Sequence, residues 1–138
     1  MLSSSPEQTF ETGREIGARL CGGEVILLAG GLGAGKTLIT KGIVEALGFE
    51  ADDVNSPSFT LVNLYETNTC AVYHIDLWRL EDAPDPAAEV GLAEILEDPD
   101  AIVIIEWSER LKSDFGPRKV VRIGIEGDGD DPRRITIA

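Results

Sequence analysis

The sequence contains GGLGAGKT at residues 30–37, which fits the phosphate-binding pattern G-x-x-x-x-G-K-[ST]. Glycines let the backbone turn tightly, so several N–H groups can approach a phosphate without an intervening side chain. Lys36 supplies a charge for the β- and γ-phosphate oxygens, and the Thr37 hydroxyl can ligate a magnesium ion that bridges them. The pattern alone leaves one alternative, a glycine-rich turn that only joins a strand to a helix.

The segments that flank this loop support phosphate binding. Residues 24–29 form a short apolar run that predicts a buried strand, and residues 38–47 predict a helix whose positive N-terminal end would face the phosphates. A second apolar run, residues 101–105, is followed by Glu106, as in proteins where an acid after a strand holds magnesium directly or through water. Both strand ends should meet at the carboxyl edge of one parallel sheet.

A histidine and an aspartate are predicted to share one face of a strand. Residues 59–65 and 70–77 predict two strands joined by a hairpin turn. Alternation along the second strand places Val72, His74 and Asp76 on the same face. His74, the only histidine, suits a structural hydrogen bond, whereas Asp76 suits either a site acid or the cap of a turn.

Two further features near these strands each allow two interpretations. Residues 50–58 have the composition of a loop, in which Ser56-Pro57-Ser58 predicts a turn that presents two hydroxyls. This turn is either an ordinary connection or a sensor of the γ-phosphate, because it follows the helix of the phosphate loop. Trp107 is equally consistent with a core anchor and with a neighbour of the nucleotide.

The first predicted helix has a face made for close packing. A Ser cap and a Pro in residues 4–7 indicate its start, and Gly22-Gly23 its end. Small and apolar residues recur along it at helical spacing: Phe10, Gly13, Gly17 and Leu20.

The remaining elements complete the predicted fold. Residues 87–96 predict a short helix inside the acidic segment 81–100, and residues 120–125 and 133–137 predict a closing hairpin. The pattern predicts a single phosphate-loop NTPase-like domain over residues 1–138. Its architecture is a three-layer α/β fold with a mixed, mainly parallel central sheet and antiparallel additions from the hairpins.

Composition narrows the classes of function. The chain has 138 residues and a formal net charge of −13, which argues against broad binding to nucleic acid or anionic lipid by this chain alone. Neither a signal peptide nor an apolar run of transmembrane length is visible, so a cytoplasmic location is expected. Cys21 and Cys70 lie far apart and are expected to be free thiols.

Four motifs in order carry a resemblance to one family. These are GGLGAGKT, VNSPSFTLVNLY, YHIDLWRL and IIEWSE. Together they resemble the small bacterial ATPase of tRNA threonylcarbamoyladenosine biosynthesis, the TsaE (formerly YjeE) family. The match extends from about the first helix to Glu109. Most phosphate-loop proteins lack both the SPSF and the HIDLWR segments, so the combination is far more specific than the phosphate loop.

The resemblance implies an activity and partners. Such proteins bind and slowly hydrolyse ATP with magnesium as cofactor, and they work with the TsaD transferase and its TsaB companion. With TsaC, which makes the activated threonylcarbamoyl donor, they modify adenosine 37 of tRNAs that read codons beginning with A. The ATPase does not perform the transfer itself, and its ATP cycle resets the transferase complex. Contact with tRNA is implied only through that complex.

The resemblance also implies roles for individual residues. Lys36, Asp76 and Glu106 would be catalytic, with Asp76 positioning the attacking or a metal-bound water. Thr37 and Glu106 would hold magnesium, and residues 56–59 would form a switch-like loop. The implied nucleotide-binding residues are Gly31, Leu32, Gly33, Ala34, Gly35, Lys36, Thr37, Leu38 and Trp107.

The chain departs from the usual family pattern at four positions. Gly31 stands where Asp is common, and Leu38 replaces a frequent second Thr, which leaves the role of a second hydroxyl open. Ser58 replaces Thr but keeps a hydroxyl, and Trp78 replaces Tyr but keeps an aromatic ring.

Two other functions compete with a partner-dependent ATPase. A small-molecule kinase of this fold would need an acceptor pocket and an arginine-rich lid, but the predicted lid region is acidic, with Arg79 and Arg110 isolated. A non-catalytic module, gated by nucleotide binding alone, is the other alternative. An obvious arginine finger is missing, although Arg79 lies just past Asp76 and could act in cis, and its lack would explain slow hydrolysis.

Overall fold

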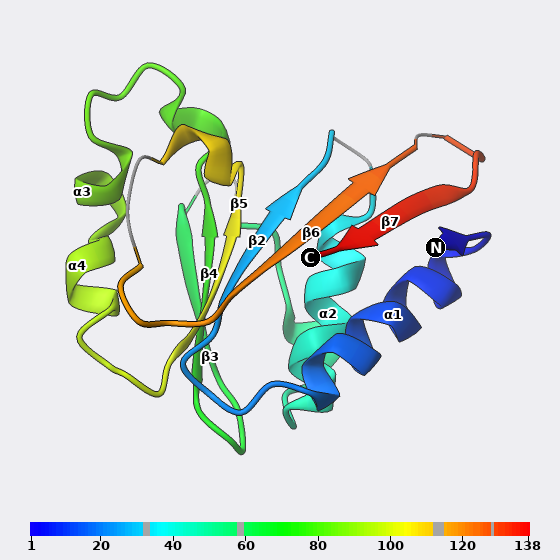
Figure 1. Cartoon of the computed structure of the whole chain (residues 1–138), viewed down its shortest axis with the longest axis horizontal. Helices are drawn as coiled ribbons and strands as arrows, with labels where there is room; N and C mark the ends of the chain where they lie inside the picture. Colours follow the sequence, from blue (N-terminus) through cyan, green and yellow to red (C-terminus); the bar gives the residue numbers. More distant parts are fainter. Residues whose placement is uncertain (32–33, 58–59, 112–114, 128) are drawn as a thin grey trace.

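A mixed sheet forms the centre of the computed structural model, which describes residues 1–31, 34–57, 60–111, 115–127 and 129–138. Over these residues the sheet has seven strands in the order β1-β7-β6-β2-β5-β4-β3 (Figure 1). The central strands β6, β2, β5 and β4 are parallel to one another, and antiparallel pairing with β7 and with β3 extends the sheet at its two edges. Their bounds are β1 Leu2–Ser3, β2 Val25–Ala29, β3 Val62–Glu66, β4 Ala71–Asp76, β5 Ile102–Glu106, β6 Val120–Glu126 and β7 Arg133–Ile137.

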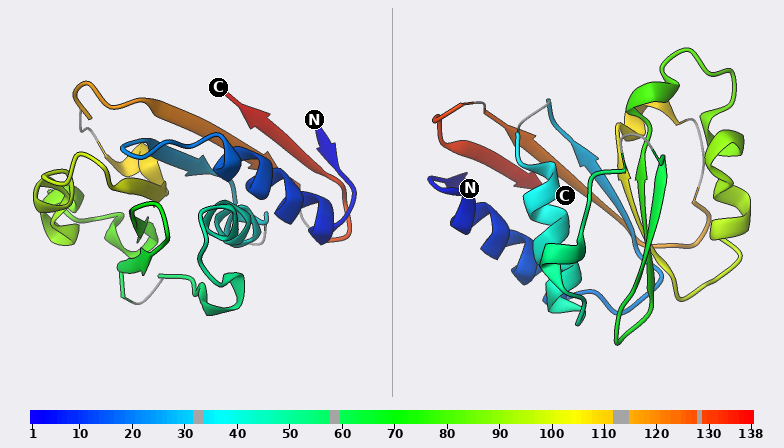
Figure 2. Two further views of the ribbon diagram at one scale, coloured as in Figure 1. Left: turned by 90° about the horizontal axis from the view of Figure 1, so that it is seen from below. Right: turned by 180° about the vertical axis from the view of Figure 1, so that it is seen from behind.

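Helices cover the sheet on both faces, which confirms the predicted three-layer α/β architecture (Figures 1 and 2). Helices α1 (Pro6–Ala18) and α2 (Lys36–Ala46) pack on one face, around a core that includes Ile26, Ile39 and Ile104. The short helices α3 (Pro86–Val90) and α4 (Leu92–Ile95) cover the other face, around a second core that includes Val103 and Ile105. Successive residues of β5 therefore enter opposite cores, as a strand buried on both faces requires.

The predicted close-packing face of the first helix lies against α2. A Cβ added to Gly13 would fall against the Ile39 carbonyl oxygen and 3.1 Å from Gly42 Cα. Only glycine at this position lets the two helix backbones approach so closely. This contact fixes α2, and with it the end of the phosphate loop, against the rest of the molecule.

Five predicted boundaries are corrected by the structure. The first helix, whose end was expected at Gly22-Gly23, already ends at Ala18 with Arg19 as its cap. The helix expected at residues 38–47 already begins at Lys36, and the loop expected at 50–58 contains a 3₁₀ turn, η1 (Ala51–Asp53). Phe59, the first residue of the strand expected at 59–65, lies outside the described residues. Strand β3 begins at Val62, because Leu61 has a left-handed φ of 68° and its N–H is bonded to Pro57 O. The helix expected at 87–96 is divided at Gly91, which has φ 69°.

Several shorter elements complete the architecture. Strand β1, which the sequence pattern did not indicate, pairs with β7, and the predicted closing hairpin is β6–β7. Two further 3₁₀ turns follow β4 and β5, namely η2 (Trp78–Leu80) and η3 (Ser108–Arg110). Cys21 and Cys70 are free thiols, as predicted. Over the ranges that the structure describes, every helix is too short or too polar to cross a bilayer.

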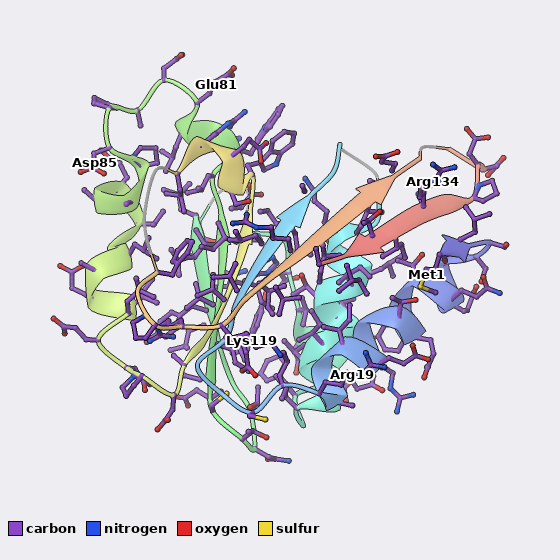
Figure 3. The ribbon with its side chains drawn as sticks, viewed as in Figure 1. Met1, Arg19, Glu81, Asp85, Lys119 and Arg134 are labelled. Carbon is purple, nitrogen blue, oxygen red and sulfur yellow. The ribbon has the colours of Figure 1, made fainter. Side chains whose placement is uncertain are left out.

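The ionised side chains are distributed unevenly over the surface. The segment 81–100, which includes α3 and α4, carries acidic residues and neither Lys nor Arg. Figure 3 shows Glu81 and Asp85 at this end of the molecule and Arg134 at the opposite end, on β7. The acidic segment 81–100 is therefore well separated from the closing hairpin β6–β7.

Candidate functional site

The phosphate loop connects the buried strand β2 to the N-terminus of α2. Gly35 precedes the helix with φ 112°, a left-handed conformation that favours glycine. The Ala34 N–H donates to Gly31 O at 3.3 Å, which closes the turn before the helix. The predicted nucleotide contacts at Leu32 and Gly33 lie outside the described residues. The loop thus presents the first N–H groups of α2 where an anion would bind.

The Lys36 ammonium is folded back onto its own loop. Lys36 is only 6% exposed, and its Nζ donates to Gly30 O at 2.8 Å. Nζ also lies 3.9 Å from Glu106 Oε1 and 4.1 Å from the centre of the Trp107 ring. Burial lowers the pKa of Lys36 from its ordinary value, while the charges of Glu106 and Asp76 act to raise it.

Two buried carboxylates lie on adjacent parallel strands beside this ammonium. Asp76 at the end of β4 is in register with Glu106 at the end of β5, and Glu106 is in register with Leu28 of β2. Both acids are less than 5% exposed. Asp76 Oδ1 accepts a hydrogen bond from Trp78 N at 2.9 Å, so Asp76 caps the turn after β4 as well as facing the site. The structure therefore brings Lys36, Asp76 and Glu106 together.

His74 is bonded to Glu106, a link that the sequence did not identify. Its Nε2 lies 2.6 Å from Glu106 Oε2, and its Nδ1 lies 3.2 Å from the Tyr65 hydroxyl. Tyr65 Oη in turn donates to Asn55 O at 2.9 Å, and burial raises the pKa of Tyr65, so the phenol keeps its proton. The predicted hydrogen-bonding role of His74 is confirmed. The only sequence signal for its partner Glu106 was that His74 shares a strand face with Asp76, the residue in register with Glu106.

An aromatic and cationic cluster lies over the same edge of the sheet. The rings of Trp107 and Trp78 are 4.8 Å apart, and the Arg110 guanidinium carbon is 5.0 Å from the Trp107 ring centre. Arg110 Nη1 donates to Leu77 O at 2.8 Å and to Trp78 O. Arg110 therefore packs on both rings and binds the backbone that follows β4. Trp107 packs on the second core, as one of its two predicted roles requires, and it also contacts Lys36 of the phosphate loop.

The donor set suits magnesium rather than a thiophilic metal. Asp76 and Glu106 provide carboxylate oxygens, and Lys36 already places a positive charge 3.9 Å from Glu106. Thr37, the second residue of α2, is half-buried and supplies a hydroxyl. Among the described residues, no group of three or more His, Cys, Asp and Glu side chains could by itself hold a metal. Magnesium needs few protein ligands when phosphates and waters complete its octahedron, so these residues fit it.

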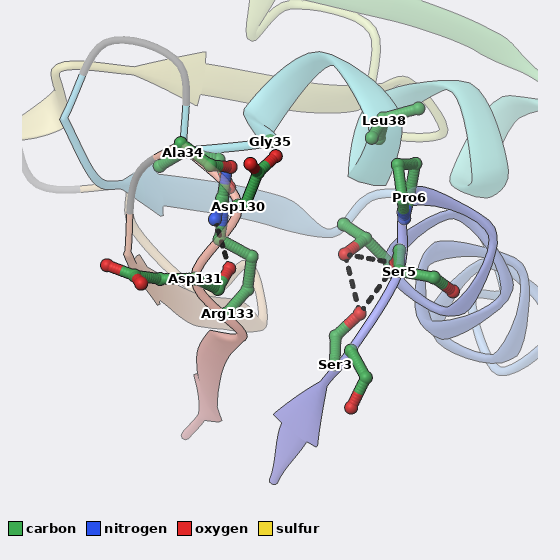
Figure 4. Close-up of a pocket in the computed structure, with 12 residues that line it drawn as sticks. Ser3, Ser5, Pro6, Ala34, Gly35, Leu38, Asp130, Asp131 and Arg133 are labelled. Atoms are coloured by element: carbon green, nitrogen blue, oxygen red, sulfur yellow. Dashed lines mark hydrogen bonds between the residues drawn. The ribbon is translucent and has the colours of Figure 1, made fainter.

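A cavity of about 230 Å³ adjoins the phosphate loop on the side of β6 and β7 (Figure 4). It lies between the start of α1, the loop residues Ala34 and Gly35, and the connection from β6 to β7. Arg133 Nε donates to Ala34 O at 3.0 Å and forms part of its wall. Leu38, which departs from the family pattern, also lines this cavity. The acids lie on strands on the other side of β2, so cavity and acids flank the loop.

Comparison with known proteins identifies the family. The family model for threonylcarbamoyl adenosine biosynthesis protein TsaE matches residues 3–135. A Bacillus subtilis protein named tRNA threonylcarbamoyladenosine biosynthesis protein TsaE is 36% identical over 132 residues, which cover 96% of this chain and 80% of that protein. A protein of the same name from Treponema pallidum is 34% identical over 99% of this chain and 98% of its own length.

Structural comparison agrees with the sequence comparison. The crystal structure of Bacillus subtilis YdiB superimposes with a TM-score of 0.74 at 29% sequence identity, covering 99% of this chain and 82% of that one. From the family model and the relatives together, the chain belongs to the TsaE family of threonylcarbamoyl adenosine biosynthesis proteins.

Proposed function

We propose that this chain is a magnesium-dependent ATPase that serves threonylcarbamoyladenosine modification of adenosine 37 in tRNA. The observation that carries the proposal is the position of Lys36, buried at the end of a phosphate loop and 3.9 Å from Glu106. Family membership supports the pathway, because the relatives bear the name of tRNA threonylcarbamoyladenosine biosynthesis proteins. The cytoplasm, where tRNA and ATP are available, is the proposed location.

The proposed mechanism relies on positioning and on charge neutralisation. The N–H groups at the start of α2 hold the phosphates, and Lys36 turns from Gly30 O to their β- and γ-oxygens. Thr37 and Glu106 would hold magnesium, which would supply positive charge to the phosphate end of the nucleotide. Asp76 accepts a hydrogen bond from the attacking water and orients it. All of these groups lie at the carboxyl ends of β4 and β5 or at the start of α2, which follows β2.

The cavity beside the loop suits the nucleoside end of ATP. The acids lie toward β4 and β5, and therefore belong at the γ-phosphate end of a triphosphate that follows the loop. The adenosine end must then extend toward β6 and β7, where the cavity of about 230 Å³ lies. The Arg133 guanidinium, which lines the cavity, offers a polar group to a base or a ribose there.

We propose that a partner completes the catalytic site. Arg110 is held by backbone carbonyls beneath Trp78, so it does not act as an arginine finger in this arrangement. A finger contributes about a thousandfold or more, so the isolated chain should hydrolyse ATP slowly. The proposed partners are a TsaD-like transferase and a TsaB-like companion, with tRNA engaged only through that complex. ATP binding and hydrolysis would reset the complex between turnovers.

Reconstitution tests the proposal. The chain is mixed with purified TsaD and TsaB homologues, and ATP hydrolysis and repeated tRNA modification are measured with and without magnesium. The expected result is co-purification that depends on ATP, faster hydrolysis in the mixture, and multiple rounds of modification. Hydrolysis that is equally fast in the isolated chain would contradict the need for a partner.

A pair of variants distinguishes hydrolysis from binding alone. Asp76→Asn and Glu106→Gln preserve side-chain size and remove the charge. Loss of both hydrolysis and repeated modification, with nucleotide binding retained, is expected if hydrolysis drives the cycle. Modification that continues in a variant unable to hydrolyse ATP would favour a nucleotide-gated module.

A further inference from the structure

His74 is the one histidine of the chain, and it is completely buried beside the proposed site without a role in the mechanism above. Both of its ring nitrogens have partners. Nε2 lies 2.6 Å from Glu106 Oε2, and Nδ1 lies 3.2 Å from the Tyr65 hydroxyl. Tyr65 is 4% exposed, so the whole connection from Tyr65 to Glu106 is shielded from water. Hydrogen bonds shielded in this way are strong and directional.

The connection ends at the loop that precedes β3. Tyr65 Oη donates to Asn55 O at 2.9 Å, and Asn63 Nδ2 donates to the same carbonyl at 3.0 Å. Tyr65 and His74 lie on the paired strands β3 and β4, which hold them at a fixed separation. A continuous path of hydrogen-bonded groups therefore joins the backbone at Asn55 to the Glu106 carboxylate.

The second acid is tied to the same loop by a separate route. The Asp76 N–H donates to Leu61 O at 2.9 Å, and the Leu61 N–H donates to Pro57 O at 2.8 Å. Leu61 adopts a left-handed φ of 68°, which is costly for a branched residue and persists only where the surroundings impose it. Leu61 and Pro57 are thus linked to Asp76 through backbone bonds, and Asn55 is linked to Glu106 through the side chains of Tyr65 and His74.

We infer that His74 and Tyr65 are positioning residues, which orient Glu106 toward the metal and couple its position to residues 54–57. The inference rests on the proposed binding of magnesium nucleotide. His74 holds Oε2 of Glu106, which leaves Oε1 directed toward Lys36 and the phosphate loop. A group that is hydrogen-bonded to a metal-ligating side chain fixes the orientation of that side chain. Its removal weakens metal affinity by about 10- to 100-fold.

Metal affinity is the first test, because it does not depend on turnover. Mn²⁺ is titrated into the full chain saturated with ADP, and free Mn²⁺ is measured by electron paramagnetic resonance. We expect His74→Ala to weaken Mn²⁺ binding by about 10- to 100-fold. His74→Gln, which can still place an N–H donor on Glu106, should recover most of that loss. A matched control is Val72→Ala, also fully buried on the same face of β4 but outside the hydrogen-bonded path. It should bind Mn²⁺ like the wild type.

Coupling to the loop is the second test. Amide hydrogen exchange of residues 54–56 is compared with and without Mn²⁺ and ADP. In the wild type, metal binding should slow this exchange, because it fixes Glu106 and hence the path to Asn55. Tyr65→Phe removes the hydroxyl and should abolish the response. The control is Tyr73→Phe, which removes a hydroxyl from β4 on the opposite face of the sheet. This variant should keep the wild-type exchange response.

The outcomes separate this inference from the proposed function. If the wild type binds no Mn²⁺ with ADP, the proposed function is wrong and the inference falls with it. If the wild type binds but His74→Ala binds equally tightly, the inference alone is wrong. An equal exchange response in Tyr65→Phe and the wild type would also overturn it. Failure of His74→Gln to recover affinity, with Val72→Ala normal, would contradict the orienting role.

Discussion

Lys36 carries opposing electrostatic demands. Burial disfavours its ammonium form, whereas Glu106 and Asp76 favour it, and the first effect is the larger, so the pKa is lowered. The folded chain therefore releases this proton more readily than the unfolded chain does. Between the lowered pKa and the ordinary value of 10.5, the unfolded state binds more protons, and the contribution of this group to stability increases with pH.

This shift predicts a pH dependence of nucleotide binding. Only the ammonium form attracts phosphate, so affinity should decrease as pH rises through the lowered pKa, before an ordinary lysine would titrate. The loss should reach about 10- to 100-fold, the equivalent of the roughly 1.5–3 kcal/mol of a hydrogen bond to a charged group. Calorimetric titration with ADP between pH 7 and 10.5 measures it. Lys36→Met should bind weakly at every pH, and a wild-type affinity that stays constant up to the ordinary value would contradict the account.

The two tryptophans predict an optical signal for nucleotide binding. Lys36 Nζ lies 4.1 Å from the Trp107 ring centre, so its movement to a phosphate must change the surroundings of that ring. Adding ADP should change tryptophan emission in the wild type and in Trp78→Phe, and should leave Trp107→Phe nearly unchanged. Trp78 is the matched control, being 4.8 Å from Trp107 and 39% exposed. A signal that disappears in Trp78→Phe and persists in Trp107→Phe would refute this assignment.

The sequence could predict individual residues where a local motif fixes their chemistry. Lys36, Thr37 and Glu106 follow from patterns in which the neighbouring residues define the strand and the loop. The pair His74–Glu106 could not be predicted in this way. Its members are 32 positions apart, and their contact depends on the register of two parallel strands, which no local pattern determines.

At the scale of elements, the contact between α1 and α2 gives a prediction about stability. Alanine usually stabilises a helix relative to glycine by about 1 kcal/mol. At Gly13, however, its Cβ would meet the Ile39 carbonyl, so Gly13→Ala should lower the free energy of unfolding by about 1–3 kcal/mol. Urea unfolding measures the difference. Gly124→Ala on β6 is the control, since its Cβ would have no neighbour within 4 Å, and equal stability of the two variants would rule out the packing argument.

Elements were predictable where periodicity and end signals agree. The start of α1 follows from its cap, because Ser5 accepts a hydrogen bond from Gln8 N and Pro6 occupies the first turn. Strand β5 follows from an uninterrupted apolar run. The predicted start of β3 was too early, because leucine suits strands and nothing in the sequence reveals the left-handed φ of Leu61. That conformation places Leu61 before the strand. Strand β1 has two residues, too few for any pattern.

At the scale of the whole molecule, charge predicts how the chain meets tRNA. The formal net charge of −13 repels a polyanion, and the acidic segment 81–100 extends over the α3 face. The isolated chain should therefore bind tRNA more weakly than the roughly 10⁻⁴–10⁻⁶ M of ordinary non-specific binding. Fluorescence anisotropy with labelled tRNA at physiological salt measures this, with the TsaD–TsaB mixture as positive control. Tight binding by the chain alone would contradict the proposal of indirect contact.

The layered architecture could be predicted from the alternation of strands and helices, but the order of the strands could not. β2 lies between β5 and β6, which are consecutive strands of the chain and are both far from β2 in sequence, and this arrangement depends on packing across the whole sheet. The same order places the acids on one side of the phosphate loop and the cavity on the other. The site is therefore a property of the assembled sheet.

The central claim is that Lys36, Thr37, Asp76 and Glu106 surround one magnesium nucleotide, and calorimetry tests it most directly. ADP is titrated into the wild type and into Glu106→Gln, each with magnesium and with a chelator. The account predicts one site in the wild type, with an affinity that magnesium increases by about tenfold or more, and a Glu106→Gln variant that binds ADP but loses this increase. No heat of binding in the wild type, or an equal effect of magnesium on both proteins, would contradict it.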